Sequence, residues 1–279
     1  MNRLSNPIIS VIVPTKNSAT TIESCLKSIH KQSYKNIEII VVDNNSSDNT
    51  KTISRKYTDY VFNYGPERSS QRNFGAKYAT GKFLLFIDSD MVLSIDVVKN
   101  CVKKTIIDQN IKSIIIPEKS FGKGFWAGCK KLEKSFYVGV DWIEAARFFE
   151  KKVFQEVGGY DEKIISGEDW DLSQKIGDKY KIDRISDFIY HNEGKISLLE
   201  TIKKKFYYAK KFNIYTEKKE NSKNLKKQTN ILLRYKLYFS NPNKLFSNPA
   251  TGIGMLFMKT CEFGFGGMGY LIGKRINNE

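Results

Sequence analysis

The chain has 279 residues, of which 41% are hydrophobic and 27% are charged, and its formal net charge at pH 7 is +16. This composition excludes general disorder and allows a core large enough for one large domain, or for a domain with a substantial extension. The positive charge predicts an anionic partner, which could be a nucleotide, a nucleic acid or an acidic lipid surface.

The N-terminal segment predicts a strand, a helix and a second strand. Apolar, β-branched residues fill 8–13 and 37–42, as in strands that are buried on both faces. Between them, Thr20 and Glu23 have the spacing of a capping box, and the apolar residues that follow recur at helical intervals. Asp43 directly follows the second expected strand.

Further helices and strands alternate up to about residue 117. Helices are expected at 52–57, 70–79 and 95–106, and strands at 60–63, 83–87 and 113–116. Such alternation predicts an α/β fold with a mainly parallel sheet and helices on both faces. Ligands of these sheets bind beyond the carboxyl ends of the strands. Beyond Pro117 the pattern is less regular, with helices expected at 125–136 and from Gly167 towards Ile176.

Two aspartates, Asp88 and Asp90, follow the expected strand at 83–87 with one serine between them. A carboxylate beside a core is costly unless it is paired, so we expect a cationic partner, and a metal ion is one candidate. In extended geometry residues i and i+2 point to the same face, which would let both carboxylates converge on one ion. Alternatively, one of the two aspartates caps the helix that follows.

Cysteine and histidine are scarce. The four cysteines are widely separated and form no CxxC pair, so we expect neither a zinc site nor a disulfide framework, and a reducing cytoplasm fits best. Only His30 and His191 occur, which excludes catalysis that depends on several histidines. The N-terminal sequence lacks the long apolar core and the cleavage site of a signal peptide, so we expect a cytoplasmic protein.

Short motifs follow one another in a fixed order along the chain. They are SVIVPTKN (10–17), EIIVVDNNSSD (38–48), SSQRNFGAKYATGKFLLFIDSDM (69–91), VGGYDE (157–162), GEDWDL (167–172) and YHNEG (190–194). In this combination the chain resembles the family 2 glycosyltransferases, which have the GT-A fold, over roughly residues 7–200. The resemblance implies a nucleotide-sugar donor, a divalent metal ion, Mg²⁺ or Mn²⁺, and an inverting single displacement.

The resemblance also implies roles on the donor side. Asp43 would contact the nucleobase or the ribose, and Pro14, Thr15 and Asn17 would line the same pocket. Arg72 would approach the nucleotide or its phosphates. The open alternative for this arginine is a surface position on a helix.

The stretch Asp88-Ser89-Asp90 matches the DxD motif of the family. In that role Asp90 would be a metal ligand, Asp88 would point towards the ribose, and Ser89 would lie in the donor pocket. A metal ion there would act as a Lewis acid on the departing diphosphate. His191 would also ligate the metal, although a lone histidine is often structural.

The acceptor side would be served by the acidic cluster of GEDWDL. Asp169 would be the general base that removes the proton of the acceptor hydroxyl, while Glu168 and Asp171 would orient the helix or the acceptor. Trp170 would stack on the sugar or acceptor, with a buried core tryptophan as the alternative. The chain lacks the QxxRW motif of processive members, so polymer synthesis is not expected.

We expect two domains, a catalytic domain at 1–195 and a basic, mostly helical C-terminal extension at 196–279. Ten lysines and two glutamates lie in 201–230, interleaved with aromatic residues. No window of about 18 clean apolar residues follows, so a transmembrane helix is not expected. We predict peripheral contact with the cytoplasmic membrane face, where a lipid-linked or glycan acceptor would be presented.

Other interpretations were weighed against this one. A nucleotidyltransferase would need a glycine-rich basic loop after the first strand, which 14–18 does not provide. The basic and aromatic residues of 201–230 would also suit nucleic acid, but no base-reading motif accompanies them, so no nucleic-acid partner is expected.

The alternative of an acceptor in solution stays open. A catalytically dead sugar-binding module is disfavoured by the complete set of aspartates. The GxGxxG spelling at 264–269 lacks a preceding strand, so it predicts close packing or membrane contact rather than a dinucleotide loop.

Overall fold

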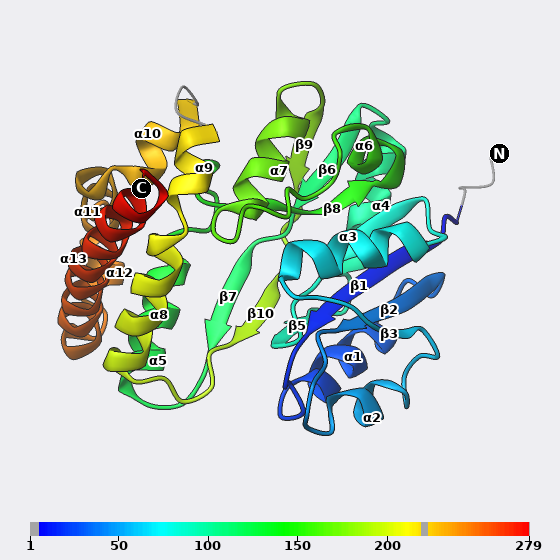
Figure 1. Cartoon of the computed structure of the whole chain (residues 1–279), viewed down its shortest axis with the longest axis horizontal. Helices are drawn as coiled ribbons and strands as arrows, with labels where there is room; N and C mark the ends of the chain where they lie inside the picture. The colour runs from blue at the N-terminus through cyan, green and yellow to red at the C-terminus, as the bar shows by residue number, and fades with distance from the viewer. Residues whose placement is uncertain (1–5, 219–222, 279) are drawn as a thin grey trace. The chain divides into compact units, whose positions relative to one another are not determined.

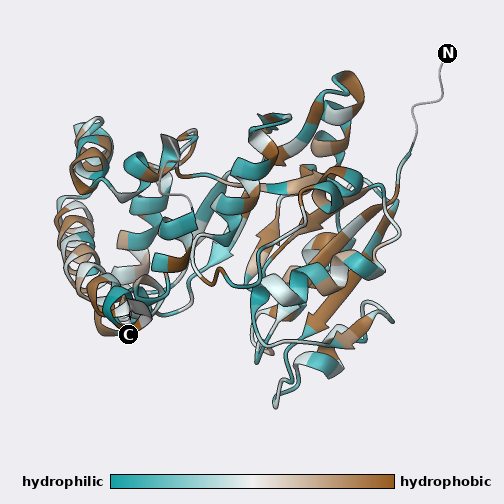
Figure 2. Ribbon diagram, turned by 45° about the horizontal axis from the view of Figure 1, so that its top comes forward, coloured by the Kyte–Doolittle hydropathy of each residue, from teal (hydrophilic) through white to brown (hydrophobic). Residues whose placement is uncertain are grey.

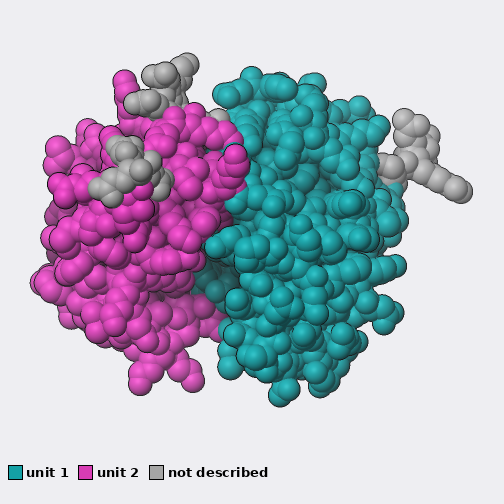
Figure 3. All heavy atoms as spheres, in the orientation of Figure 1, with its two compact units in different colours: residues 1–117, 145–162, 169–191 teal, residues 118–144, 163–168, 192–279 magenta. Residues whose placement is uncertain are grey.

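The computed structural model describes residues 6–218 and 223–278. The chain forms two compact units, shown in separate colours in Figure 3. Unit 1 takes its described residues from 1–117, 145–162 and 169–191, and unit 2 from 118–144, 163–168 and 192–279. The division into two domains at residue 195 stays a prediction. The units interleave in sequence, because 118–144 belongs with the C-terminal residues.

Unit 1 is built around a mixed sheet with the strand order β3-β2-β1-β4-β8-β6-β9 among its described residues. The strands are β1 (Ile9–Thr15), β2 (Ile37–Asp43), β3 (Val61–Asn63), β4 (Phe83–Phe86), β6 (Ile111–Ile115), β8 (Ala146–Glu150) and β9 (Lys181–Arg184). Strand β1 pairs in parallel with β2 and β4, and β8 runs antiparallel to β4 and β6. The predicted α/β fold with a mainly parallel sheet is confirmed (Figure 1).

Except for α6, which was not expected, the helices of this unit agree with the expected positions, with shifts at their ends. They are α1 (Ile22–His30), α2 (Thr50–Ser54), α3 (Arg68–Tyr78), α4 (Val97–Ile107), α6 (Lys151–Glu156) and α7 (Glu168–Gly177). Helix α7 belongs to unit 1 from its second residue onward. The capping box predicted before α1 is wrong, because Thr21 is the N-cap residue and no side chain caps this helix. The Thr21 hydroxyl instead donates to the Ser18 carbonyl oxygen.

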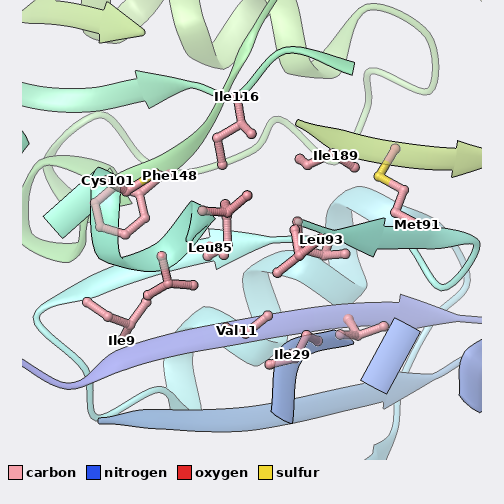
Figure 4. Close-up of a cluster of buried hydrophobic side chains, with 14 of the residues drawn as sticks. Ile9, Val11, Ile29, Leu85, Met91, Leu93, Cys101, Ile116, Phe148 and Ile189 are labelled. Atoms are coloured by element: carbon pink, nitrogen blue, oxygen red, sulfur yellow. The ribbon is translucent and has the colours of Figure 1, made fainter. Parts of the chain in front are cut away.

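Alternating residues of β1 enter two different cores, one on each face of the sheet. Val11 packs with residues of α1 and α4, whereas Ile12 packs with residues of α3 and α7. Figure 4 shows the first of these cores, with Val11, Leu85 and Phe148 of the sheet and Ile29 and Cys101 of the helices. Figure 2 shows the corresponding hydrophobic colour along the strands. Each such fully buried apolar side chain contributes about 1.5–3 kcal/mol, so the sheet is a rigid base for the loops at its edges.

Unit 2 is mainly helical. Its described helices are α5 (Phe125–Ser135), α8 (Leu198–Lys210), α9 (Asn213–Lys218), α10 (Lys223–Thr229), α11 (Ile231–Phe239), α12 (Pro242–Leu245) and α13 (Pro249–Asn278), and β7 (Glu118–Phe121) precedes them. Helix α13 packs along α8 and α5 (Figure 1). The expected helical C-terminal region is confirmed. Part of the lysine-rich segment, 219–222, lies outside the described residues.

The glycines of 264–269 lie inside α13 and not in a loop. A side chain on Gly269 would come within 2.5 Å of the Phe206 carbonyl oxygen, and one on Gly273 would come still closer to that of Lys210. These glycines therefore let α13 approach the backbone of α8, as small residues do at close helix crossings. The expectation of close packing is confirmed at Gly269, whereas Gly264 and Gly267 face open space.

Across the described part of the chain, no helix combines the length and the apolar character that crossing a membrane requires.

Candidate active site

The carboxyl ends of β1, β2 and β4 meet at one edge of the sheet, because these strands are parallel. Thr15 and Asp43 are the last residues of β1 and β2 and are directly in register. Asp88 is the second residue after the end of β4 at Phe86. The fold therefore gathers at this edge the residues that the sequence placed in the donor pocket.

Two loops at this edge are tied together by hydrogen bonds around Asp43. The buried Asp43 carboxylate accepts from the backbone N–H of Ser46 at 2.7 Å and from its hydroxyl at 2.5 Å. The Asn17 N–H donates to the Ser46 hydroxyl oxygen at 2.7 Å, and the Asn17 side-chain oxygen accepts from the Ser47 N–H at 2.9 Å. Asn17 adopts a left-handed backbone with φ of 48°, which asparagine tolerates better than most residues. Asp43 and Asn17 thus shape one polar wall.

The other predicted donor-side residues lie at the same edge. Pro14 pairs with Val42 in the strand register, just before Thr15. The Thr15 hydroxyl is buried and has no hydrogen-bond partner within the residues that the structure describes. The Ser89 hydroxyl donates to that of Ser18 at 2.9 Å. Their contact with a donor stays a prediction.

Arg72 occupies the centre of the site. This side chain, on α3, is fully buried, and its guanidinium contacts Asp88 Oδ1 at 2.7 Å and Asp169 Oδ1 at 3.1 Å. One arginine therefore bridges the first aspartate of the DxD motif and the predicted general base. The alternative of a surface position for Arg72 is wrong, and a contact with the nucleotide or its phosphates stays a prediction.

The VGGYDE motif holds this arginine in place. The guanidinium carbon of Arg72 lies 5.0 Å from the ring centroid of Tyr160, in a cation–π arrangement. The Asn73 side chain donates to the Tyr160 carbonyl oxygen at 2.8 Å and accepts from the Tyr160 N–H at 3.0 Å. A side chain on Gly159, whose φ is 66°, would come within 2.8 Å of Asn73. The glycine is therefore needed for α3 and this turn to meet.

The two DxD aspartates face different partners. The chain turns between them, with the Met91 N–H donating to the Asp88 carbonyl oxygen at 3.0 Å, so the expected extended geometry is wrong. The convergence of both carboxylates on one ion stays a prediction. The expectation of a cationic partner is confirmed for Asp88, whose partner is Arg72. The capping alternative is also wrong, because β5 (Met91–Leu93) intervenes and α4 is preceded by Asp96 as its N-cap residue.

A second arginine at this site was missed by the sequence analysis. Arg147 lies on β8 with its Nη1 3.8 Å from Asp88 Oδ2, and it is largely buried. Burial by itself raises the pKa of the Asp88 carboxyl, but the charges of Arg72, Arg147 and Arg68 outweigh it and hold that pKa well below the usual range. An arginine in the otherwise apolar strand ARFFE was the signal available in the sequence.

Asp90 lies next to His191 rather than the arginines. His191 is inside β10 (Ile189–Asn192), and β10 pairs with β5 so that His191 is in register with Met91. The imidazole Nε2 is 3.2 Å from Asp90 Oδ2. Asp90 Oδ1 is buried and accepts no hydrogen bond from the described residues.

Asp90 and His191 are suited to be part of the ligand set of a metal site. Carboxylate oxygen and imidazole nitrogen are ligands that Mn²⁺ accepts, and Mg²⁺ accepts the carboxylate. The described residues contain no cluster of three or more histidine, cysteine, aspartate or glutamate side chains that could hold a metal ion. A metal at Asp90 and His191 would therefore need further oxygen ligands from a diphosphate and water.

Asp169 begins the first turn of α7 within unit 1, and its side chain is 26% exposed. The two neighbouring acidic residues are more buried. Asp171 is fully buried and pairs with Lys175 of the same helix at 2.8 Å, and its role in orienting the helix or the acceptor stays a prediction. Trp170 is half-buried, and Glu168 is buried and belongs to unit 2. Of the three acids in this cluster, Asp169 has the most exposed side chain.

Comparison with known sequences places this geometry in a family context. The sequence model described as Glycosyl transferase family 2 matches residues 10–152, more than half of the chain. The Escherichia coli protein UDP-Glc:alpha-D-GlcNAc-diphosphoundecaprenol beta-1,3-glucosyltransferase WfgD is 36% identical over 88 residues, covering 30% of this chain and 35% of that protein. The Campylobacter jejuni GalNAc(5)-diNAcBac-PP-undecaprenol beta-1,3-glucosyltransferase is 40% identical over 92 residues, 30% of each chain. This chain thus spans about a third of the length of these two relatives.

Solved structures show the same fold. Mannosyltransferase PcManGT from Pyrobaculum calidifontis, solved in complex with GDP-Man and Mn²⁺, superposes with a TM-score of 0.59 at 17% identity, covering 96% of this chain and 84% of that one. S. aureus TarS superposes with a TM-score of 0.54 at 24% identity, covering 72% of this chain and 39% of that one. At these identities the likeness concerns the fold.

Proposed function

The chain belongs to the family 2 glycosyltransferases, and from this premise we propose that it transfers a sugar from a nucleoside diphosphate sugar to an acceptor hydroxyl or phosphate, with inversion at the anomeric carbon. The observation that carries the proposal is the bridge from Asp88 through the buried Arg72 to Asp169. It links the residues proposed for the donor and acceptor sides of one displacement.

The donor would lie against the carboxyl edge of the sheet. Asp43 and Asn17 form the polar wall there, and the buried Thr15 hydroxyl has unused hydrogen-bonding capacity within the described residues. We propose that this wall receives the base and ribose. The TarS structures with UDP and UDP-GlcNAc and the PcManGT structure with GDP-Man support a nucleotide donor by analogy of fold, and the choice of base and sugar is a matter for experiment.

Asp90 and His191 would hold a divalent cation, Mn²⁺ or Mg²⁺, together with the diphosphate of the donor. A cation bound there supplies a Lewis acid for the leaving diphosphate. Asp88 is occupied by arginines, so in this proposal its task is to fix Arg72 and Arg147 and to approach the ribose.

Asp169 would act as the general base. The acceptor oxygen forms its bond to the anomeric carbon while the bond from that carbon to the diphosphate breaks, and the acceptor proton passes to the Asp169 carboxylate. Arg72 would be a positioning residue, because it is buried and holds one oxygen of Asp169 at 3.1 Å. This leaves the second carboxylate oxygen as the proton acceptor.

The acceptor is proposed to be lipid-linked, with peripheral contact of the enzyme at the cytoplasmic membrane face. The support is that the E. coli and C. jejuni relatives are named for diphosphoundecaprenol and PP-undecaprenol acceptors, although they share only about a third of their length with this chain. An acceptor in solution is the alternative.

A donor screen tests the proposed function. Purified protein is incubated with a panel of UDP- and GDP-sugars in Mn²⁺ or Mg²⁺, and the melting temperature and the release of nucleoside diphosphate are measured. At least one nucleotide sugar should raise the melting temperature and be slowly hydrolysed in a metal-dependent way. If no nucleotide sugar did either with either metal, the proposed function would be overturned.

A further inference from the structure

Between residues 253 and 272, helix α13 has its charged residues on the inside and large apolar residues on the outside. Lys259 and Glu262 are buried, with residue exposures of 4% and 2%. All exposed positions of this helix from 253 to 272 are uncharged, and most are large and apolar: Ile253, Phe257, Phe265, Met268, Leu271 and Ile272. A helix on a water-facing surface has the opposite pattern, with charged residues outside.

The buried charges fix which side of α13 faces outward. Lys259 contacts Glu133 of α5 at 2.8 Å and Glu262 on its own helix at 2.5 Å, and Lys130 contacts the same two glutamates at 2.8 and 3.2 Å. Rotation of α13 about its axis would break this network and leave charges buried without partners, which is strongly unfavourable. The outward apolar side is therefore a fixed feature of unit 2.

Helix α11 extends this surface. The Tyr235 hydroxyl lies 2.6 Å from that of Thr260, which joins α11 to the outer side of α13. Leu232 and Phe239, on the exposed side of α11, are large apolar residues, and Lys236 is exposed between them. We call the exposed residues of α11 and α13 together the outer face.

The exposed charges of the segment that forms the outer face have one sign. Between residues 223 and 278, Glu262 is the only acidic residue in the sequence, and it is buried. The charged side chains that the structure shows exposed in this segment are all basic: Lys226, Lys227, Lys236, Lys274 and Arg275. An apolar surface on a segment whose exposed charges are basic is complementary to a layer that is apolar inside and anionic at its boundary.

We propose that the outer face of α11 and α13 is the membrane-binding surface, and that its partner is a bilayer containing anionic lipids. The apolar side chains would enter the boundary between headgroups and acyl chains, while the exposed lysines and Arg275 would contact lipid phosphates. A nucleic acid would use the basic side chains but not the apolar side chains. This inference adds a membrane-binding surface to the proposed function with a lipid-linked acceptor. It rests on that proposal only for the biological role of the surface.

The sequence predicted membrane contact for the basic extension 196–279, and the structure limits the side chains that can make this contact. Met255 and Met258 are fully buried in the core of unit 2, so they do not insert. Of the three aromatic residues at 206–208, Tyr207 is exposed and its neighbours are half-buried. Insertion is therefore assigned to side chains such as Phe257 and Leu271, which are 54% and 63% exposed.

Flotation of the full-length protein with liposomes tests the inference. Vesicles of phosphatidylcholine alone and of phosphatidylcholine with phosphatidylglycerol are compared at low and high salt, without donor or acceptor. The protein should float with the anionic vesicles, and high salt should release only part of it, because salt screens the charges but not apolar insertion. Absence of flotation with both vesicle types would overturn the inference and leave the donor chemistry untouched.

Matched variants identify the surface. Phe257 and Leu271 are fourteen residues apart, about four helical turns, and the double substitution Phe257→Gln/Leu271→Gln should lower partitioning about tenfold for each side chain. The control is Ile95→Gln/Ile107→Gln, which changes two equally exposed apolar residues of unit 1 and should float like the wild type. Equal loss in both variants would overturn the assignment to the outer face.

Two further measurements separate the remaining outcomes. The triple variant Lys236→Gln/Lys274→Gln/Arg275→Gln should lose affinity for anionic vesicles by about fivefold for each charge, and its binding should respond less to salt than that of the wild type, because Lys226 and Lys227 remain. Sedimentation without lipid gives the oligomeric state. A dimer that Phe257→Gln/Leu271→Gln converts to a monomer, without vesicle binding by the wild type, would identify the outer face as a contact between copies of the chain and overturn the proposal.

Discussion

Each unit contains a buried group of ion-paired side chains, and the two groups differ in how completely they are closed. In unit 2, Lys130 and Lys259 pair with Glu133 and Glu262, and both glutamate side chains are 3% exposed. In unit 1, the fully buried Arg72 pairs with Asp88 and Asp169, whose side chains are 17% and 26% exposed. A closed and balanced network stabilises a fold, whereas one whose carboxylates reach the surface can act on a ligand.

The comparison teaches that burial and ion pairing alone do not mark an active site. Both networks join residues distant in sequence, and both contain carboxyls with lowered pKa values. What distinguishes unit 1 is its position at the carboxyl ends of parallel strands and its opening to solvent. The predictions below test whether the two networks divide catalysis and stability in this way.

The substitution Asp169→Asn is expected to have the largest effect on the rate of transfer. This change removes the proposed base at almost constant volume, so transfer should fall by about a hundred- to ten-thousand-fold, while nucleotide affinity stays nearly unchanged. Initial rates of transfer and nucleotide titrations measure the two quantities. Asp171→Asn is the control, because Asp171 is paired with Lys175 and should affect stability more than transfer. Transfer by Asp169→Asn at a tenth of the normal rate or better would exclude Asp169 as the base.

A large effect is also expected from Asp90→Ala. Loss of this ligand should reduce transfer at least about a hundredfold and weaken the dependence on added Mn²⁺ or Mg²⁺, because the leaving diphosphate loses its Lewis acid. Activity is measured in chelator-treated buffer as metal is added back. Near-normal turnover at saturating metal would show the assignment of Asp90 to be wrong.

A smaller effect on transfer is expected from Arg72→Lys. Lysine keeps the charge but cannot reach two carboxylates with one planar group, so kcat should fall about tenfold with little change in donor KM. The double variant Arg72→Lys/Asp169→Asn tests the mechanism. If Arg72 acts by positioning Asp169, the lysine change should cause almost no further loss in that background, whereas independent, additive losses would exclude a positioning role.

No direct effect on transfer is expected from Glu133→Gln in unit 2, although stability should fall. Breaking a buried charge network by removing one partner costs about 3–5 kcal/mol, which urea unfolding at pH 7 measures. Glu23→Gln is the control, since Glu23 and Lys27 form an exposed pair and its loss should leave unfolding unchanged. Loss of transfer by folded Glu133→Gln, at equal donor affinity, would contradict the division between the units.

The same residue predicts a pH dependence. Burial raises the pKa of Glu133, but the charges of Lys130 and Lys259 outweigh it and hold the folded pKa well below the usual value. Its stabilising contribution is therefore present above the pKa of the unfolded state, about 4.3, and is lost as pH falls through the lower folded pKa. The acid side of the unfolding profile should accordingly be shallower in Glu133→Gln, and identical profiles would contradict this.

Much of unit 1 was predictable because its signals are local. Runs such as 8–13 and 37–42 are apolar on both faces, which is what a strand between two helical layers requires. The aspartates after β2 and β4 are recognisable because polar residues interrupt apolar strands at their carboxyl ends. The order of the motifs led to the family for the same reason.

The contacts across the site were not predictable from spacing. Arg72 lies 97 positions from Asp169 and 16 from Asp88, so no local period reports their meeting. Arg147 entered the site because β8 runs antiparallel beside β4, a pairing decided by the whole sheet. A turn follows Asp88, and the two aspartates have different partners, Arg72 for Asp88 and His191 for Asp90.

By itself the sequence determined the α/β class, the family, the acidic strand ends and the basic character of the C-terminal region, because composition and short periods carry these properties. Tertiary structure alone decided that 118–144 joins the C-terminal unit, that Lys259 and Glu262 turn inward, and that Phe257 and Leu271 face outward. The physical reason is that α13 has apolar residues on nearly every side, so its own pattern does not select a buried face. The buried face of α13 is selected by its packing partners, through the charges of α5 and the close approach of α8 at Gly269 and Gly273.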